Sequence, residues 1–477
     1  MKRKLALLLA CVLMVSTFAA CGDQKTSSKG DVPTLTWYIP GATPADCDLV
    51  EAEINKIIEP EIGAKLDFIY LDSGAYDEKM NMMMASQTPF DLAFSGWVNK
   101  FDKGVSRKGF LKLDKYLDKH PKLKEAVPEL AWKAVTADDG IYAVPNQQIY
   151  IMWQALYITK KYVDKYNLDV SKVKGPKDLI PFMEKIRDNE PDVYVYKTSL
   201  WPFVSVNTTL PVPSLANFMV DNNDPECKVY AAYETEKYLD AAKTIKDFYD
   251  RGFIRKDIAS SKGSTTSSKQ TVITQGAYKP GAEADIARTD RGEVVAIPLG
   301  EPFVSADMIR QTLTAVGALS KNPDKAVKLL EMVNTDKELF RLIVHGIEGK
   351  HYEKLESGHI RILDSKSYGQ HTAGWYYGNQ FNSYVVEGKD LDIWDQMREL
   401  NETAQKSPLI GFNFDSSKIV NEISNVSAAT DEFNGLENGT VDTEQTLAKY
   451  KKAANVAGAQ AIITELQKQI DAFLQKK

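Results

Sequence analysis

The residue types that support covalent, metal or nucleotide chemistry occur in this 477-residue sequence, but not in the spacings that such chemistry needs. The histidines show no HExxH or comparable ligand spacing, no cysteine pair suits zinc, and neither GxSxG nor GxGxxG is present. Gly346-Ile-Glu-Gly-Lys350 has the wrong glycine spacing for a phosphate loop, and His351 stands where Ser or Thr would hold magnesium. We therefore predict no metal and no cofactor.

Aromatic and amide side chains instead gather where predicted strands end. A flat aromatic ring can stack on an apolar face of a ligand, while fixed amides hydrogen-bond its polar rim. Ligands of open α/β sheets sit beyond the carboxyl ends of the strands. The competing interpretation for each residue is a buried packing role. The candidate binding residues are Tyr38, Tyr76, Trp97, Asn99, Gln147, Trp201, Trp375, Tyr376 and Asn379.

The elements that would position these residues alternate between strand and helix periodicity, which predicts an α/β fold with helices on both faces of a parallel sheet. A helix over 76–85 carries four methionines, which we interpret as a core-facing stripe. The apolar run 149–158 has no clear punctuation and receives no assignment. Strands are predicted at 35–39, 65–70, 90–95, 141–145, 294–297 and 313–319, and helices at 50–58, 176–189, 235–251, 322–333, 443–456 and 460–473.

Composition narrows the class of protein. Hydrophobic residues make up 43% and charged residues 26%, which excludes a disordered chain, a collagen and a polytopic membrane protein. The net charge of −6, from 59 basic and 65 acidic residues, leaves no basic surplus to neutralise phosphates, so we predict no nucleic-acid partner.

The N-terminus has the pattern of a secretory signal. Lys2-Arg-Lys4 precedes an apolar run over 5–18, and Ala19-Ala-Cys21 follows. This ending resembles a bacterial lipobox, in which the cysteine is lipidated and becomes the new N-terminus, although Phe18 stands where Leu is usual. We predict a signal peptide over 1–20 and a tether over 21–31 lipidated at Cys21; the alternative is a plain secretory signal. A bridge between the two remaining cysteines, Cys47 and Cys227, is left open.

Several stretches, taken in order, resemble one family. The chain is similar to the extracellular solute-binding lipoproteins of bacterial ABC importers, of the sugar-binding type found in Firmicutes with an extra C-terminal domain. The matching stretches are 34–38, 91–97, 140–145, 322–326, 346–352, 374–379 and 411–415.

This resemblance implies a two-lobed, periplasmic-binding-protein-like clamshell of type II, with an extended C-terminal helical region. Lobe one is expected at 32–146 and 300–345, and lobe two at 147–299 and 346–477. The implied protein is a monomer and not an enzyme. It is anchored through lipid at the outer face of the cytoplasmic membrane, captures a carbohydrate, here an oligosaccharide, and delivers it to permease subunits. The candidate aromatics would then stack on pyranose rings.

Other functions stay open at this point. The ligand could be another solute such as a peptide, because a fold alone does not fix a ligand. A surface glycan-acting enzyme is a second alternative, because the separation of a glycosidase carboxylate pair is invisible in sequence. A sensor that reports to a membrane kinase is a third. The acidity of the chain disfavours polyanionic glycans, unless a local Arg or Lys overrides it.

Overall fold

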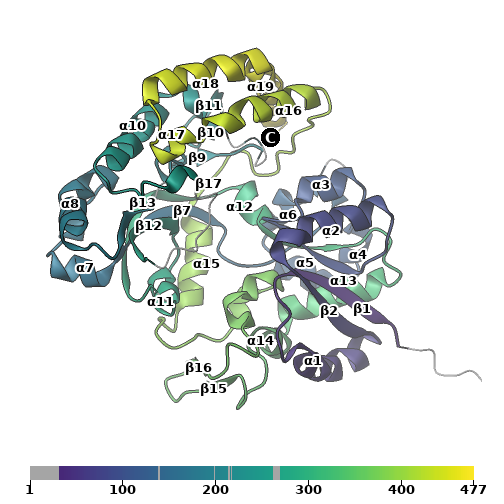
Figure 1. Ribbon diagram of the computed structural model, residues 1–477. Coiled ribbons are helices and arrows are strands. Elements are labelled where there is room, and N and C mark those ends of the chain that lie inside the picture. The colour runs from purple at the N-terminus through teal and green to yellow at the C-terminus, as the bar shows by residue number, and fades with distance from the viewer. Residues whose placement is uncertain are drawn as a thin grey trace, which may run out of the picture.

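The computed structural model describes residues 32–476, apart from 138–139, 198, 213–214, 216, 261–268 and 290. The described chain forms two lobes, each built on a five-stranded sheet with its own buried hydrophobic cluster (Figure 1). The predicted signal peptide and Cys21 lie outside the described residues. Among the described helices, none combines the length and apolarity needed to cross a membrane. The two-lobed α/β fold is confirmed.

The sheet of the first lobe has the order β2-β1-β3-β14-β6. Its first three strands are parallel, as the alternation of strand and helix predicts. β14 runs antiparallel to β3, contrary to the parallel-sheet prediction, because the chain re-enters this lobe at the carboxyl end of β3, where Thr312 pairs with Gly96. The strands are β1 (Thr34–Pro40), β2 (Lys65–Leu71), β3 (Leu92–Gly96), β14 (Thr312–Val316) and β6 (Val144–Pro145).

Helices cover both faces of this sheet (Figure 1). Three of the four methionines in α2 are buried, as predicted, while Met82 is exposed. The helices are α1 (Cys47–Ile62), α2 (Ser73–Ala85), α3 (Phe101–Ser106), α4 (Asp114–Leu117), α5 (Pro121–Ala126), α6 (Glu129–Ala134), α12 (Ala306–Arg310), α13 (Pro323–Thr335) and α14 (Lys337–His345).

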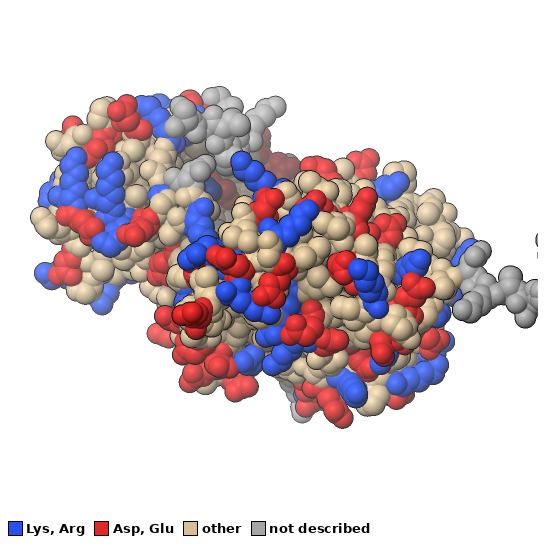
Figure 2. All heavy atoms as spheres, turned by 90° about the horizontal axis from the view of Figure 1, so that it is seen from below, with Lys and Arg blue, Asp and Glu red and all other residues tan. Residues whose placement is uncertain are grey.

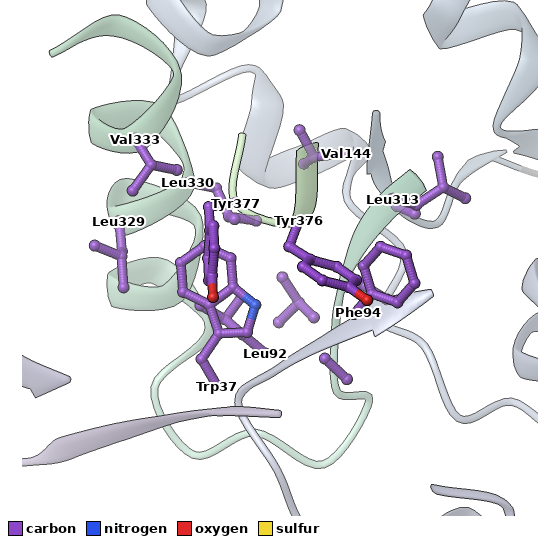
Figure 3. Packing of buried hydrophobic residues seen from close by; sticks show 14 of the residues in the cluster. Trp37, Leu92, Phe94, Val144, Leu313, Leu329, Leu330, Val333, Tyr376 and Tyr377 are labelled. Carbon is purple, nitrogen blue, oxygen red and sulfur yellow. The ribbon is translucent and has the colours of Figure 1, made fainter. Parts of the chain in front are cut away.

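An aromatic core joins this sheet to a segment that comes much later in the chain. The Trp37 ring lies edge-on to Tyr377, with 5.9 Å between ring centroids (Figure 3). The Tyr377 hydroxyl hydrogen-bonds that of Tyr70 at 2.9 Å. Tyr368 is buried in the same cluster. Residues 368–377, which we expected in lobe two, therefore pack against the first sheet, since these large rings find their buried partners there.

The second sheet has the order β17-β13-β7-β12-β8, with β7 antiparallel to both β12 and β13. The unassigned run 149–158 is mostly β7 (Ile151–Thr159), whose last five residues are all buried. Burial of both faces removes the alternation that identifies a strand. The other strands are β17 (Gln405–Lys406), β13 (Val294–Val304), β12 (Thr271–Ala277) and β8 (Tyr194–Tyr196), and the helices are α7 (Lys160–Lys165), α8 (Ile180–Asn189), α10 (Glu236–Asp250) and α11 (Ala282–Ala287).

The C-terminal helices belong to the second lobe (Figure 1). The last predicted helix, 460–473, is confirmed, and its Ile462, Leu466 and Ile470 are fully buried at helical spacing. Cys227 is also buried in this lobe and Cys47 is buried in the first, so no disulfide joins the two. The elements are β9 (Thr208–Thr209), β10 (Phe218–Asp221), β11 (Val229–Ala231), α9 (Trp201–Val204), α16 (Val420–Thr430), α17 (Gly435–Asn438), α18 (Thr443–Ala457) and α19 (Ala459–Leu474).

The chain passes between the lobes at 146–150, at 304–306 and at 404–407, and hydrogen bonds hold these crossings together. Ser407 donates its backbone N–H to the carbonyl of Val304 at 2.8 Å. Asn401, in α15 (Ile393–Thr403), accepts from the N–H of Tyr150 and donates to the carbonyl of Gln148, both at 2.7 Å. The crossings therefore form one connected hinge region. Short pairs complete the described strands: β4 (Thr136–Ala137) with β5 (Gly140–Ile141), and β15 (Tyr352–Lys354) with β16 (Ile360–Ile362).

Candidate functional site

An exposed aromatic surface lies at the carboxyl end of β3. A Cβ on Gly96 would come within 1.9 Å of the Gln311 carbonyl oxygen, so glycine is needed for the chain to pass α12 this closely. The next residue, Trp97, donates its N–H to that carbonyl at 3.1 Å and leaves its side chain 39% exposed. Because Arg310 of α12 donates to the carbonyl of Phe412 and to Asn413 Oδ1, Trp97 beside the end of α12 is at the side of the first lobe that faces the second.

The segment 374–379 extends this surface. The rings of Trp375 and Tyr376 lie 3.9 Å apart, and Tyr376 packs edge-on against Phe94 at 4.8 Å (Figure 3). Burial raises the pKa of Tyr376, and the Trp97 side chain beside the Tyr376 hydroxyl opposes that rise. Asn146 fixes the segment from below by donating to the carbonyls of Trp375 and Tyr376. Trp97, Tyr376 and Trp375 thus form one rigid surface, which we call the first-lobe aromatic surface.

The second lobe contributes an aromatic pair of its own at the junction between the lobes. Trp153 and Tyr278 meet edge-on with 4.9 Å between ring centroids, and Trp153 also packs against the hydrophobic cluster of the first lobe. The indole N–H of Trp153 donates to the Gly300 carbonyl at 3.0 Å, which holds its ring in place. The pair lines a cavity of about 580 Å³ between α11 and the start of α15. Cavities of this size are typical of ligand sites.

A larger cavity of about 850 Å³ adjoins this one, and the two share Lys389. It lies between α11 and residues 362–394, and we call it the α11 cavity. His371 and Thr372, which line it, come four and three residues before Trp375 in the chain. Buried His345 lies at its wall with its Nε2 2.8 Å from Ser383 Oγ, and burial lowers the pKa of that histidine to about 3.

Polar side chains that the sequence reasoning missed flank the aromatic surface. Gln148 donates to Thr312 Oγ1 at 2.8 Å, and Gln311 donates to Asp307 Oδ1 at 2.9 Å. Burial raises the pKa of Asp307. Both glutamines are half-buried beside the carboxyl end of β3, where amides can hydrogen-bond ligand hydroxyls. The signal available in sequence was the amide run 146–148 after a predicted strand, of which Gln147 was chosen.

Several predicted site residues use their polar atoms inside the first lobe. The hydroxyl of fully buried Tyr76 donates to the carbonyls of Tyr38 and Phe94, at 2.9 and 3.0 Å. Asn99 is 1% exposed and also donates to Phe94. Gln147, 5% exposed, donates to Asn334 Oδ1 at 3.1 Å. These contacts favour a packing role for the three side chains.

Among the remaining candidates, Tyr38 and Asn379 also make contacts within the fold. Tyr38 is half-buried against Phe90, and burial raises its pKa. Asn379 accepts from the N–H of Phe381, which caps a short helical turn. Trp201 begins α9, and its side chain lies outside the described atoms. Of the nine candidates, the structure brings Trp97, Trp375 and Tyr376 together at one surface, and for these a ligand contact stays a prediction.

The charges do not indicate a nucleic-acid or metal site. On the face shown in Figure 2, basic and acidic side chains are interspersed without an extended basic area. Among the described residues, no group of His, Cys, Asp and Glu is arranged to hold a metal ion. Gly346–Lys350 forms a turn in which His351 Nδ1 accepts from Ile347 N–H, and His351 Nε2 lies 3.0 Å from Asp46 Oδ2. This segment therefore has a structural role.

Comparison with known proteins gives consistent matches over nearly the whole chain. A carbohydrate ABC transporter substrate-binding protein of Streptococcus pneumoniae is 30% identical, over 98% of this chain and 97% of that protein. A Bacillus subtilis protein named lipoprotein LipO is 22% identical, over 77% of this chain and 76% of that one. Residues 408–475 match the family described as a domain of unknown function, DUF3502.

The solved N-glycan transport solute binding protein of S. pneumoniae matches with a TM-score of 0.86 and 28% identity, covering 93% of this chain and all of that one. Its complexes with Man1GlcNAc and Man5GlcNAc match over the same share of this chain with TM-scores of 0.80 and 0.77. This chain is thus more similar overall to the first of these three structures than to either complex.

Proposed function

Because the chain belongs to the carbohydrate ABC transporter substrate-binding proteins, we propose that it captures an N-glycan-type oligosaccharide between its lobes and releases it unchanged to a permease. The observation that carries this proposal is the first-lobe aromatic surface, since Trp97 and Trp375 are held rigidly and partly exposed at the side that faces the second lobe. Rigid, partly exposed rings suit the apolar faces of pyranoses, and the neighbouring glutamines suit their hydroxyls.

The mechanism we propose is closure of the second lobe on a glycan seated at the first. Trp153 and Tyr278 would then cover the ligand from the other side, and the contacts from both lobes would stabilise the closed state. The permease would bind the closed form, and the lobes would open again as the sugar leaves.

We also propose that Cys21 carries a lipid that anchors the mature protein at the outer face of the membrane. The signal-like N-terminus and the relative named as a lipoprotein support this anchor. Lobe one would consist of 32–146, about 305–345 and the segment 346–404 that packs beside it, and lobe two of the rest.

The test of the proposal is calorimetric titration of the mature domain, with Cys21 removed, against Man5GlcNAc and against short peptides. We expect saturable binding of the glycan alone, a rise in the unfolding midpoint, and recovery of the glycan with unchanged mass. Binding of a peptide but no glycan would overturn the carbohydrate assignment for this chain. Cleavage of the recovered glycan would instead favour the glycan-acting enzyme.

A further inference from the structure

The α11 cavity gathers cations around a single carboxylate. Asp285 lies 2.6 Å from Lys389 Nζ, 3.3 Å from Arg288 Nη1 and 3.7 Å from Lys279 Nζ. All four residues line the cavity. Glu387, the other acidic side chain at its wall, has its carboxylate 3.0 Å from Arg361 and so is already neutralised. The cavity therefore has an excess of positive charge.

Burial strengthens the electrostatic effect of this excess positive charge. The side chain of Lys389 is only 11% exposed, and burial lowers its pKa; Asp285 opposes that lowering, and Lys279 and Arg288 add to it. Burial and the nearby Arg288 also lower the pKa of His371. A partly buried cation without a full counter-charge is costly, and an entering anion would offset that cost.

The neighbouring cavity has the opposite balance, although it shares Lys389. Its wall carries Glu283, Glu293 and Asp390 against Lys160 and Lys389. An anion would thus be attracted to the α11 cavity and repelled from the adjoining one. Of these two cavities, only the α11 cavity therefore favours a negatively charged ligand, although the chain as a whole is acidic.

The α11 cavity also has features that suit a sugar ring. Trp394 and Tyr384 line it, and Trp394 is held by a hydrogen bond from its indole N–H to the Ser383 carbonyl at 3.1 Å. Its volume of about 850 Å³ falls within the range of small-molecule sites. His371 and Thr372 at its wall are within four residues of Trp375 in the chain, so a branch of a glycan bound at the first-lobe aromatic surface could extend towards it.

We propose that the α11 cavity binds the carboxylate of an acidic sugar at the end of a glycan branch, with Lys279, Arg288 and Lys389 as its partners. Charge-assisted hydrogen bonds from these cations would hold the carboxylate, and the aromatic wall would cover the ring. This inference rests on the proposed function, because it assigns the end of a glycan whose other sugars occupy the first-lobe aromatic surface.

The test compares a sialylated biantennary N-glycan with the same glycan after removal of its sialic acids, by calorimetric titration. We expect the sialylated form to bind about tenfold more tightly at low salt, and expect the preference to weaken as salt is added. Lys279→Gln and Arg288→Gln should each reduce the preference by about three- to fivefold. Lys122→Gln, at an exposed lysine of α5, removes the same charge elsewhere and should preserve it.

Each outcome separates this inference from the proposed function. Equal binding of the two glycans would overturn the acidic subsite and leave glycan capture intact. A preference that survives both substitutions would overturn its location in the α11 cavity. If neither glycan binds while Man5GlcNAc does, the acidic subsite is overturned and the proposed function stands; if Man5GlcNAc does not bind either, both are overturned. The unfolding midpoint of each variant checks folding, and Lys279→Gln, which loses only a contact of 3.7 Å, provides the test if Arg288→Gln does not fold.

Discussion

Truncation of Trp97 tests how the first lobe would hold a sugar. The side chain is 39% exposed, and because tryptophan buries at most about 250 Å², roughly 100 Å² is free for a sugar ring to cover. At about 25 cal/mol per Å², covering that area contributes about 2.5 kcal/mol to binding. Trp97→Ala should therefore raise the Kd for Man5GlcNAc by up to about 60-fold. Stability should also fall, because the larger part of the residue is buried against the first lobe.

Calorimetric titration measures the Kd, and thermal unfolding checks the fold. Trp97→Phe separates stacking from the polar contribution of the indole N–H beside Tyr376, because phenylalanine retains a ring but lacks that N–H. It should bind within about tenfold of the parent protein. Leu319→Ala removes another exposed apolar side chain, 51% exposed, and should leave the Kd unchanged. A Kd for Trp97→Ala within twofold of the parent value, with the fold intact, would refute the assignment of Trp97 to the ligand surface.

Three further predictions follow from buried polar groups. Asn401→Ala removes two hydrogen bonds of 2.7 Å from the hinge and leaves the N–H of Tyr150 without its acceptor. Urea unfolding should therefore show a free energy of unfolding that is lower by about 2 kcal/mol. A decrease below about 0.5 kcal/mol would contradict this. Tyr76→Phe should cost about 1 kcal/mol by the same measurement without changing glycan affinity, and a weaker Kd would place Tyr76 at the ligand. Burial lowers the pKa of His345 to about 3. The unfolded state therefore binds the extra proton first, and stability should fall as pH drops from about 6.5 towards 3 by up to about 1.4 kcal/mol per unit. His345→Gln should flatten this dependence in pH-resolved thermal unfolding, and an unchanged slope would assign it to other groups.

Much of the fold could be predicted because local pattern and tertiary environment agree. α19 carries its apolar residues at helical spacing, and the same stripe is buried. Prediction failed where the environment removes the pattern, as in β7, which is buried on both faces and so shows no alternation. It failed again for β14, because its direction depends on a crossing from the other lobe rather than on its own residues.

The candidate site was predictable only in part, for a related reason. Trp97 follows a strand and a glycine, and that local context is enough to place its ring at the sheet edge. The environment of Gln147 depends on Asn334, 187 residues away, and no local pattern reports such a partner. Trp153 was missed because it stands within the unassigned run 149–158, where no strand end was recognised.

The two ends of the described chain lie on different lobes: β1 begins in the first, and α19 closes the second (Figure 1). A rotation about the hinge would change the distance between them. Fluorescent donor and acceptor groups attached at these ends would convert lobe closure into a change in energy transfer. The fold thus has the layout of an optical reporter for its own ligand, and labelling it would disturb neither the aromatic surface nor the crossings.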